Sequence, residues 1–268
     1  MQDLIRSVDL KLARADFQIC SLTDQISAWI SSNPITARCE LCEGRLGFRL
    51  IVQDFAENAP IDHWGLLIGE CVHNLRSALD NLAFALARLQ RDPPSRPSAI
   101  AFPICQDRSR FENSGRAKLD QMPARAGELI ERLQPFQRDG SQEAGTPDSD
   151  PLVLLQWLSN TDKHRVPSVV LIAPTEMSHS CRAAFYSEED AKANVPPDTT
   201  VWFGPLHPGV VLMEYRTNRP IESVRGDYSG IAIVSIETID QTAPVVEVLR
   251  ALSHYTALVV AQFRGFFK

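Results

Sequence analysis

Two long segments of the chain carry apolar residues at helical spacing, and each ends shortly before proline. Between residues 2 and 32 apolar side chains recur every three or four positions, and Pro34 follows. Between residues 61 and 90 the same spacing begins after a capping residue, Asp62, and stops before Pro93 and Pro94. Since proline cannot continue the interior of a helix, we expect two long helices, one in each segment.

Shorter patterns predict the other elements. A change to β-type residues predicts a hairpin over 36–55, and polar turn residues predict an exposed loop over 137–150. Further helices are expected over residues 107–120, 124–134, 152–163 and 243–267. Further strands are expected over residues 169–172, 183–186, 201–203, 210–215 and 231–236.

This order of elements predicts an α+β fold, in which a bundle of long helices packs beside an antiparallel β-sheet. We expect a single domain over residues 1–268. Its helical part covers approximately 1–165 plus 243–267, and its strand-rich part approximately 168–237. Two separable domains are the less favoured alternative, because the last helix needs the earlier helices as packing partners.

Composition restricts the choice of partner and compartment. The formal net charge of -6 gives no overall attraction to nucleic acid, so a phosphate contact has to come from a local cluster of Arg or Lys. No basic stretch followed by an apolar run opens the sequence, and no segment has the roughly 20 apolar residues of a membrane span. We therefore expect a cytoplasmic protein with no membrane partner, and its six cysteines are expected to be thiols.

The polar face of the helix over 61–90 is the first candidate site. At about 100° per residue, six polar side chains share less than half of its circumference. They are Glu70, His73, Arg76, Ser77, Asp80 and Asn81. Exposed helix faces are normally written in strong helix formers, whereas His, Asn, Ser and Asp are weaker ones, which indicates specific partners. The structural alternative is a network in which Arg76 pairs with Asp80 at i,i+4.

A second polar cluster lies where the helix over 152–163 ends. It consists of Asn160, Thr161, Asp162, Lys163, His164 and Arg165. Cations near a helix C-terminus are favoured by the helix dipole, which alone explains Lys163, His164 and Arg165. The functional interpretation is a ligand site for a phosphate-bearing or other anionic molecule. The predicted ligand-binding residues are Asn81, Asn160, Asp162, Lys163 and Arg165. We expect this cluster to meet the polar face.

Both polar segments belong to recognisable motifs. The first is His-Asn-Leu-Arg-Ser-Ala-Leu-Asp-Asn-Leu at 73–82, the second is Asn-Thr-Asp-Lys-His-Arg at 160–165, and Phe-Pro-Ile at 102–104 lies between them. The chain resembles a family of uncharacterised bacterial proteins that share both motifs, a resemblance that brings no settled function with it.

More distantly, Arg76 resembles the arginine in the Arg-x4-His signature of the HEPN superfamily, with Asn81 in place of the histidine. That superfamily contains helical, metal-independent ribonucleases of toxin and defence systems, whose Arg and His meet across a dimer interface. The resemblance implies a homodimer that binds or cleaves RNA or a nucleotide. Its predicted catalytic residues are His73, Arg76, Asp80 and His164. Arg76 would hold phosphate, His73 or His164 would move protons, and Asp80 would orient one of them.

Two further hypotheses come from other classes of protein. One is a non-enzymatic interaction protein in which the motifs form a structural polar network. The other is a metal-dependent hydrolase that uses the Glu-x-x-His step at Glu70 and His73, with a second such step at 176–179, or a mononuclear site of His73, Asp80 and His164 or Asp162. The preferred expectation includes no metal and no cofactor. Cys39 and Cys42 are interpreted as ordinary cysteines, because no second close pair completes a zinc site.

Overall fold

The computed structural model describes residues 2–141, 145–173, 180–194, 198–226 and 228–268. These ranges contain seven α-helices, α1–α7, and ten strands, β1–β10. The largest sheet has five strands, all joined by antiparallel pairing. The predicted α+β class is confirmed.

The chain divides into two compact units, each built from separate pieces of sequence. The helical unit comprises residues 1–23, 62–168 and 237–268, and the strand unit comprises residues 24–61 and 169–236. The two hollows and the cysteine pair described below each lie within one unit. The expectation of a single domain stays a prediction.

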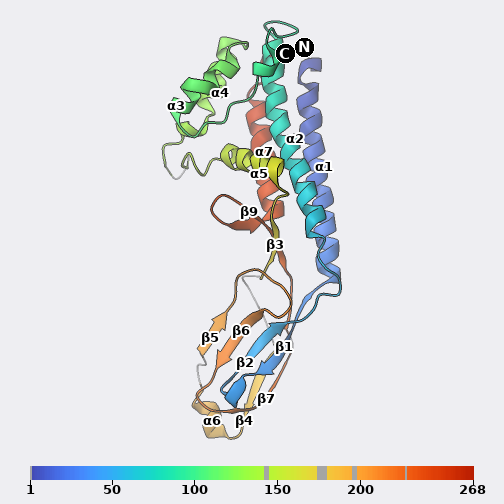
Figure 1. Cartoon of the computed structure of the whole chain (residues 1–268), viewed down its shortest axis with the longest axis vertical. Helices are drawn as coiled ribbons and strands as arrows, with labels where there is room; N and C mark the ends of the chain where they lie inside the picture. Colours follow the sequence, from blue (N-terminus) through green and yellow to red (C-terminus); the bar gives the residue numbers. More distant parts are fainter. Residues whose placement is uncertain (1, 142–144, 174–179, 195–197, 227) are drawn as a thin grey trace. The chain divides into compact units, whose positions relative to one another are not determined.

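Three long helices form the frame of the helical unit. α1 (Gln2–Ser32) and α2 (Ile61–Arg88) run side by side (Figure 1). They are joined by hydrogen bonds from Lys11 Nζ to Asn74 Oδ1 (2.9 Å) and from Asn74 Nδ2 to Gln18 Oε1 (2.9 Å). α7 (Val245–Ala261) lies against α1, where Ser253 Oγ donates to Asp16 Oδ1 at 2.6 Å. The two predicted long helices are confirmed, and so is the helix near the C-terminus, which ends earlier than expected.

The core of the helical unit lies along the apolar stripe of α2, as the spacing predicts. Its fully buried stripe residues are Cys71, Leu75, Leu79, Leu82 and Leu86. The largest other buried side chains of this unit are Trp64, Phe102, Phe111 and Phe263. Complete burial of such side chains contributes about 1.5–3 kcal/mol each, so this stripe contributes substantially to the stability of the unit.

Shorter helices complete the helical unit. α3 (Arg108–Arg110) continues into a π-turn (Phe111–Gly115) and a 3₁₀ turn (Arg116–Leu119), so the predicted helix over 107–120 exists but is irregular. α4 (Ala124–Arg132) and α5 (Pro151–His164) match the other two predictions. α5 packs against α7 and begins at the buried Asp150, which accepts a hydrogen bond from the Leu152 N–H (2.8 Å).

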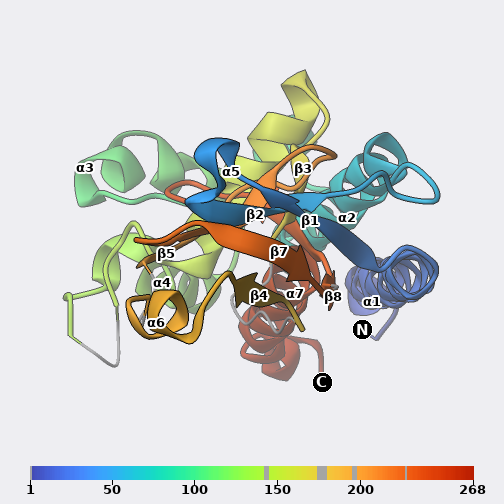
Figure 2. The ribbon, with the colours of Figure 1, turned by 90° about the horizontal axis from the view of Figure 1, so that it is seen from below.

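The strand unit is organised around the predicted hairpin. β1 (Ile35–Leu41) and β2 (Gly47–Val52) pair with Cys39 opposite Leu50. The five-stranded sheet has the order β5-β6-β2-β1-β8, with β5 (Asp198–Val201), β6 (Val211–Arg216) and β8 (Tyr228–Gly230). Figure 2 shows β1 and β2 beside each other. One register shift falls between Leu50 and Ile51 in the pairing of β2 with β6.

Two smaller sheets complete the strand unit. β4 (Arg182–Phe185) pairs with β7 (Ile221–Arg225), and the two lie side by side in Figure 2. β3 (Val169–Ile172) pairs with β9 (Ile233–Glu237), and α6 (Glu188–Lys192) follows β4. The short strand β10 (Thr242–Pro244) falls in the helical unit. β3 has the bounds predicted for it, and the other four strands predicted after residue 168 overlap β4, β5, β6 and β9 with shifted ends. β7, β8 and β10 were not predicted.

No helix in the described ranges combines the length and the apolar character that crossing a membrane would require.

Candidate functional site

Arg76 is held in a compact polar lock within the helical unit. Its Nη2 donates to the carbonyl of Phe102 (2.8 Å) and lies 3.1 Å from Asp80 Oδ1. The same carboxylate oxygen accepts the Phe102 N–H at 3.0 Å. The i,i+4 pair that the spacing suggested is therefore formed, and it also fixes the chain that follows α2. Only 13% of the Arg76 side chain is exposed, against 40% for Asp80.

The positive charge of the buried Arg76 guanidinium is only partly neutralised by the groups around it. Desolvation lowers its pKa, and the nearby Asp80 charge only partly offsets that effect. Its Nη1 atom is buried and has no hydrogen-bond acceptor among the described residues. A buried donor without an acceptor costs about 1–3 kcal/mol. The described residues therefore do not satisfy all the hydrogen bonds that the Arg76 guanidinium can donate.

Arg76 lies at the edge of a hollow of about 490 Å³, which we call the cationic hollow. Its polar and aromatic lining includes Arg76, Arg110, Lys118, Gln156, Trp157 and Asn160. No aspartate, glutamate or histidine of the described ranges lines it. The volume falls in the range of small-molecule sites, about 300–1,000 Å³. The lining therefore combines three cations and amide groups with the indole ring of Trp157.

Two of the three cations stand on one face of the irregular helix after Asp107. Arg110, Ser114 and Lys118 are four residues apart, so they follow one side of the helical turns and reach the same hollow. Neither Arg110 nor Lys118 forms an ion pair with a described residue. Both charges act on the nearby Cys105: burial raises the pKa of its thiol, and the two cations oppose that rise.

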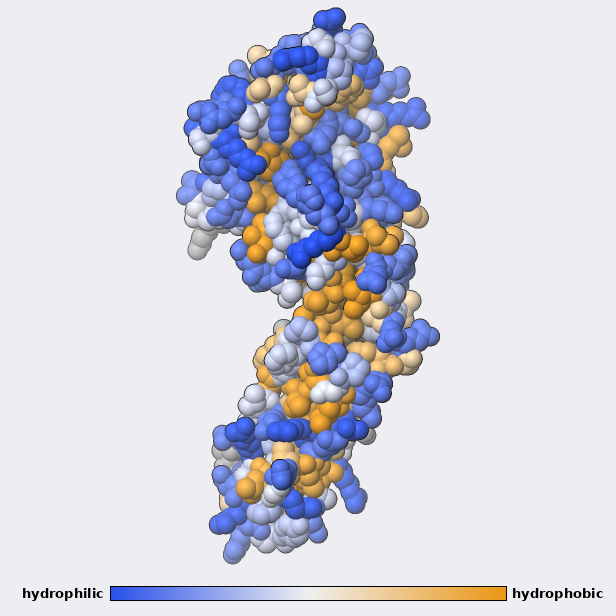
Figure 3. All heavy atoms as spheres, viewed as in Figure 1, coloured by the Kyte–Doolittle hydropathy of each residue, from blue (hydrophilic) through white to orange (hydrophobic). Residues whose placement is uncertain are grey.

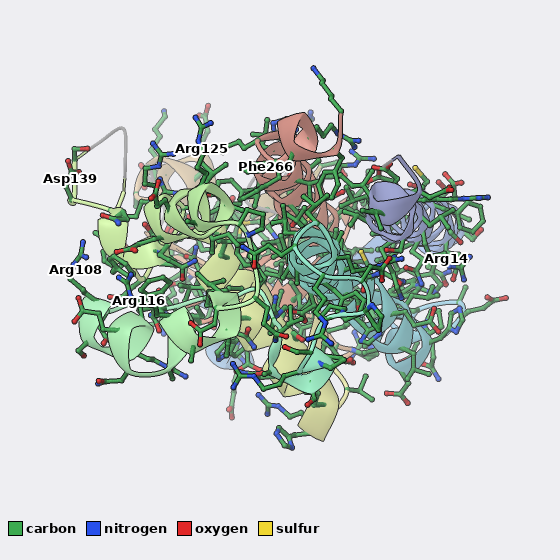
Figure 4. All side chains as sticks on the ribbon, turned by 90° about the horizontal axis from the view of Figure 1, so that it is seen from above. Arg14, Arg108, Arg116, Arg125, Asp139 and Phe266 are labelled. Atoms are coloured by element: carbon green, nitrogen blue, oxygen red, sulfur yellow. The ribbon has the colours of Figure 1, made fainter. Side chains whose placement is uncertain are left out.

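On the other face of the same segment, the arginines form ion pairs. Arg108 and Arg116 both pair with Glu131 of α4, at 3.3 and 3.1 Å. Figure 4 shows these two arginines in the α3 region, and hydrophilic residues cover most of the α3 and α4 surface seen in Figure 3. The arginines that face α4 are therefore paired with a carboxylate, whereas Arg110 and Lys118, which face the cationic hollow, are not.

α5 supplies the aromatic and amide side of the cationic hollow. Gln156, Trp157 and Asn160 lie three and four residues apart on one face of the helix. Trp157 is half-buried, and Gln156 Nε2 donates to Asn160 Oδ1 at 2.8 Å. The predicted ligand residue Asn160 therefore lines the same hollow as Arg76.

His73 lies in a different place, although it is only three residues before Arg76. It lines a second hollow, the histidine hollow, whose other polar members are Arg14, Gln18, Glu70, Asn74 and Asp162. The Asp162 carboxylate packs directly on Gly69, at the point where any other residue would place its Cβ atom. His73 Nε2 lies 3.3 Å from Ser77 Oγ.

The predicted meeting of the two motifs is therefore divided between two hollows. Asn160 joins Arg76 in the cationic hollow, and Asp162 joins His73 in the histidine hollow. Residues two apart on a helix point to nearly opposite sides, so α5 separates the two pairs.

The remaining predicted residues lie outside both hollows. Lys163 and His164 are exposed in the last turn of α5, and Arg165 lies 3.5 Å from Glu237. Asp80 stays in the lock with Arg76, and Asn81 is half-buried.

Asp162 gives the histidine hollow a testable pH dependence. Burial raises the pKa of its carboxyl, and the charge of His73 partly opposes the rise. The folded protein therefore binds this proton more tightly than the unfolded chain does. The resulting stability is complete below the unfolded pKa of about 3.9, and is lost as pH rises through the higher folded value.

We therefore expect Asp162→Asn to melt at a higher temperature than the wild type at pH 7, and to lose this part of the pH dependence. Thermal unfolding followed by circular dichroism between pH 3 and 7 measures both effects. Asp24→Asn, at an exposed position of α1, is the control. A lower melting temperature for Asp162→Asn across the whole range would mean that the carboxylate is a net stabilising group.

The described residues offer no cluster of metal ligands for the metal-dependent hydrolase hypothesis. Within the described ranges, no group of three or more His, Cys, Asp or Glu side chains is placed to hold a metal ion. The second Glu-x-x-His step, at 176–179, lies outside the described residues.

Sequence reasoning missed Arg110, Lys118, Gln156 and Trp157. The four-residue spacing of Arg110, Ser114 and Lys118 inside a predicted helix was the available signal for the first two. The apolar periodicity of 152–163 predicts a helix there, but it does not show that Gln156 and Trp157 face a hollow.

Comparisons with protein-family models, with curated proteins and with solved structures find no match for this chain. The resemblance to the HEPN superfamily and to the bacterial family with both motifs stays a prediction.

Proposed function

We propose that the protein binds a nucleotide in the cationic hollow, with the phosphate held by Arg110, Lys118 and Arg76 and the base against Trp157. The observation that carries this proposal is the lining itself, where three cations converge without any acidic residue among the described ones. Arginine and lysine beside an aromatic ring match the two parts of a nucleotide, an anion and a planar base.

Charge favours a single nucleotide over a long nucleic acid. An extended RNA backbone is normally bound by a basic surface that neutralises many phosphates. This chain has a formal net charge of -6, so its positive potential is local. A small ligand with one phosphate group needs only the few cations that meet in the cationic hollow.

The lining of the cationic hollow supports ligand binding and not acid–base catalysis. Its described lining contains no imidazole or carboxylate that could exchange a proton near neutral pH. His73 lines the histidine hollow, and His164 is exposed at the end of α5. Cleavage of RNA by either histidine therefore stays a prediction, separate from the binding proposed here.

The test is isothermal titration calorimetry with the four nucleoside 5′-monophosphates, the corresponding nucleosides, inorganic phosphate, and a short single-stranded oligonucleotide. We expect at least one monophosphate to bind more tightly than its nucleoside and than phosphate alone. Replacing Arg110 and Lys118 together by alanine should weaken that binding about tenfold or more, since charge-assisted hydrogen bonds are worth about 1.5–3 kcal/mol each.

The matched control is Arg108→Ala with Arg116→Ala, which removes two cations from the same segment but from the face paired with Glu131. Binding in this variant should stay near the wild-type value. If the nucleoside bound as tightly as its monophosphate, or if both double variants lost the same affinity, phosphate recognition in the cationic hollow would be excluded. Tight binding of the oligonucleotide alone would point to RNA as the ligand.

A further inference from the structure

Two cysteines that are far apart in the sequence meet in the strand unit. Cys39 lies in β1, and Cys181 comes directly before β4. Their Sγ atoms are 2.8 Å apart, although 142 positions separate the residues. Ordinary contacts between heavy atoms lie at about 3.5–4.0 Å, so the two thiols are unusually close.

The backbone around the two thiols is arranged for this approach. Gly226 follows β7 with φ of +139°, a value that favours glycine. A Cβ atom at this position would collide with the backbone of Cys181, and the carbonyl of Gly226 lies 3.4 Å from Cys39 Sγ. The pairing of Arg182 with Arg225 then fixes Cys181 at the end of the β4–β7 pair, and β1 contacts β7. A glycine thus makes room where the two cysteines meet.

The pair is open to small molecules. Both cysteines are partly exposed. Cys181 also lines a hollow of about 240 Å³, together with Phe48, Asn194 and Tyr215. Thiol–disulfide exchange requires that the attacking sulfur reach the sulfur of its partner, and this hollow provides such access for a small-molecule disulfide.

We propose that Cys39 and Cys181 are a modification site, at which an intramolecular disulfide forms by exchange with a low-molecular-weight disulfide such as oxidised glutathione. The Cys181 thiolate attacks one glutathione sulfur, forms a mixed disulfide and releases one glutathione thiolate. The Cys39 thiolate then attacks the Cys181 sulfur, forms the protein disulfide and releases the second glutathione. The protein thiols lose two electrons and two protons, and one glutathione disulfide is reduced to two thiols.

The bond joins separate parts of the strand unit. It would connect β1 of the five-stranded sheet to the β4–β7 pair, and it would close a long loop of chain. Closing a loop of this length limits the unfolded chain much more than the folded one. For a chain of this size, the corresponding rise in melting temperature is about 5–10 °C.

The experiment uses the full chain, incubated with oxidised or with reduced glutathione and then digested without reduction for peptide mapping by mass spectrometry. We expect one linked peptide pair that contains Cys39 and Cys181, a mass loss of about 2 Da, and the higher melting temperature. Cys39→Ser and Cys181→Ser should each abolish the shift. Cys20→Ser and Cys42→Ser, at exposed and half-buried positions, should keep it.

The mapping of the wild-type protein decides the proposal even where a serine variant fails to fold. A bridge between Cys39 and Cys42, stable mixed disulfides without an internal bond, or unlinked Cys39 and Cys181 peptides would each overturn it. In extended chain, residues three apart point to opposite faces, so Cys42 is not expected to replace Cys181.

Discussion

Arg76→Ala is expected to weaken nucleotide binding by about tenfold to a hundredfold and to lower the free energy of unfolding by about 1–3 kcal/mol. The first effect follows from the position of the guanidinium in the cationic hollow. The second follows from the lock, because the carbonyl of Phe102 loses its donor and Asp80 loses its cation. Calorimetric titration measures the first quantity, and urea unfolding measures the second.

α2 itself supplies a matched control for Arg76. Arg88 and Asp92 form another i,i+4 pair, at 2.7 Å, but both side chains are more exposed than Arg76. Exposed pairs contribute little, so Arg88→Ala should change stability much less than Arg76→Ala does and leave binding unchanged. Arg76→Lys keeps the charge without the planar fork, and its affinity should lie between the wild type and Arg76→Ala. Normal binding by Arg76→Ala would remove this residue from the proposed site.

Asp150→Ala is expected to give the largest loss of stability, about 3–5 kcal/mol. The Asp150 side chain is fully buried and accepts from Arg138 Nε at 2.7 Å. It also caps the N-terminus of α5 through the Leu152 N–H, an interaction worth about 1 kcal/mol. Alanine removes the cap and leaves the partly buried Arg138 without its carboxylate, although Arg138 still donates to the Tyr255 hydroxyl.

Two companion variants separate the charge of Asp150 from its cap. Asp150→Asn keeps a capping oxygen and loses the charge, so it should be less destabilised than Asp150→Ala. Adding Arg138→Met to Asp150→Ala should recover part of the loss, because no unpaired cation remains. Chemical denaturation gives all three values. A loss below about 1 kcal/mol for Asp150→Ala would show that water or a local shift replaces both interactions.

Periodic elements were predictable from the sequence, and elements that depend on distant partners were not. The apolar spacing of residues 61–90 identifies α2 and its buried stripe almost completely, because a single face of this helix packs into the core. β7 and β8 escaped detection because they are short and rich in polar residues. β8 exists through pairing with β1, far away in the sequence. Such pairing leaves no local pattern to recognise.

The candidate site shows the same division. The pair of Arg76 and Asp80 follows from i,i+4 spacing within one helix. A helical wheel also placed His73 on the same face as Arg76, although neighbouring directions on α2 reach different hollows. That separation depends on the position of α5, and the sequence of α2 carries no information about that position. The convergence of Arg110 and Lys118 with Arg76 likewise depends on the path of the chain after Phe102.

The helical unit is made of three separate stretches of sequence, and this has a consequence for biosynthesis. α7 is translated after both stretches of the strand unit, yet it contacts α1, where Ser253 donates to Asp16 across 237 positions. Until α7 leaves the ribosome, the apolar surface that it will cover on the earlier helices remains exposed. The nascent chain therefore passes through a long period in which it is a natural client for chaperones that shield apolar surface.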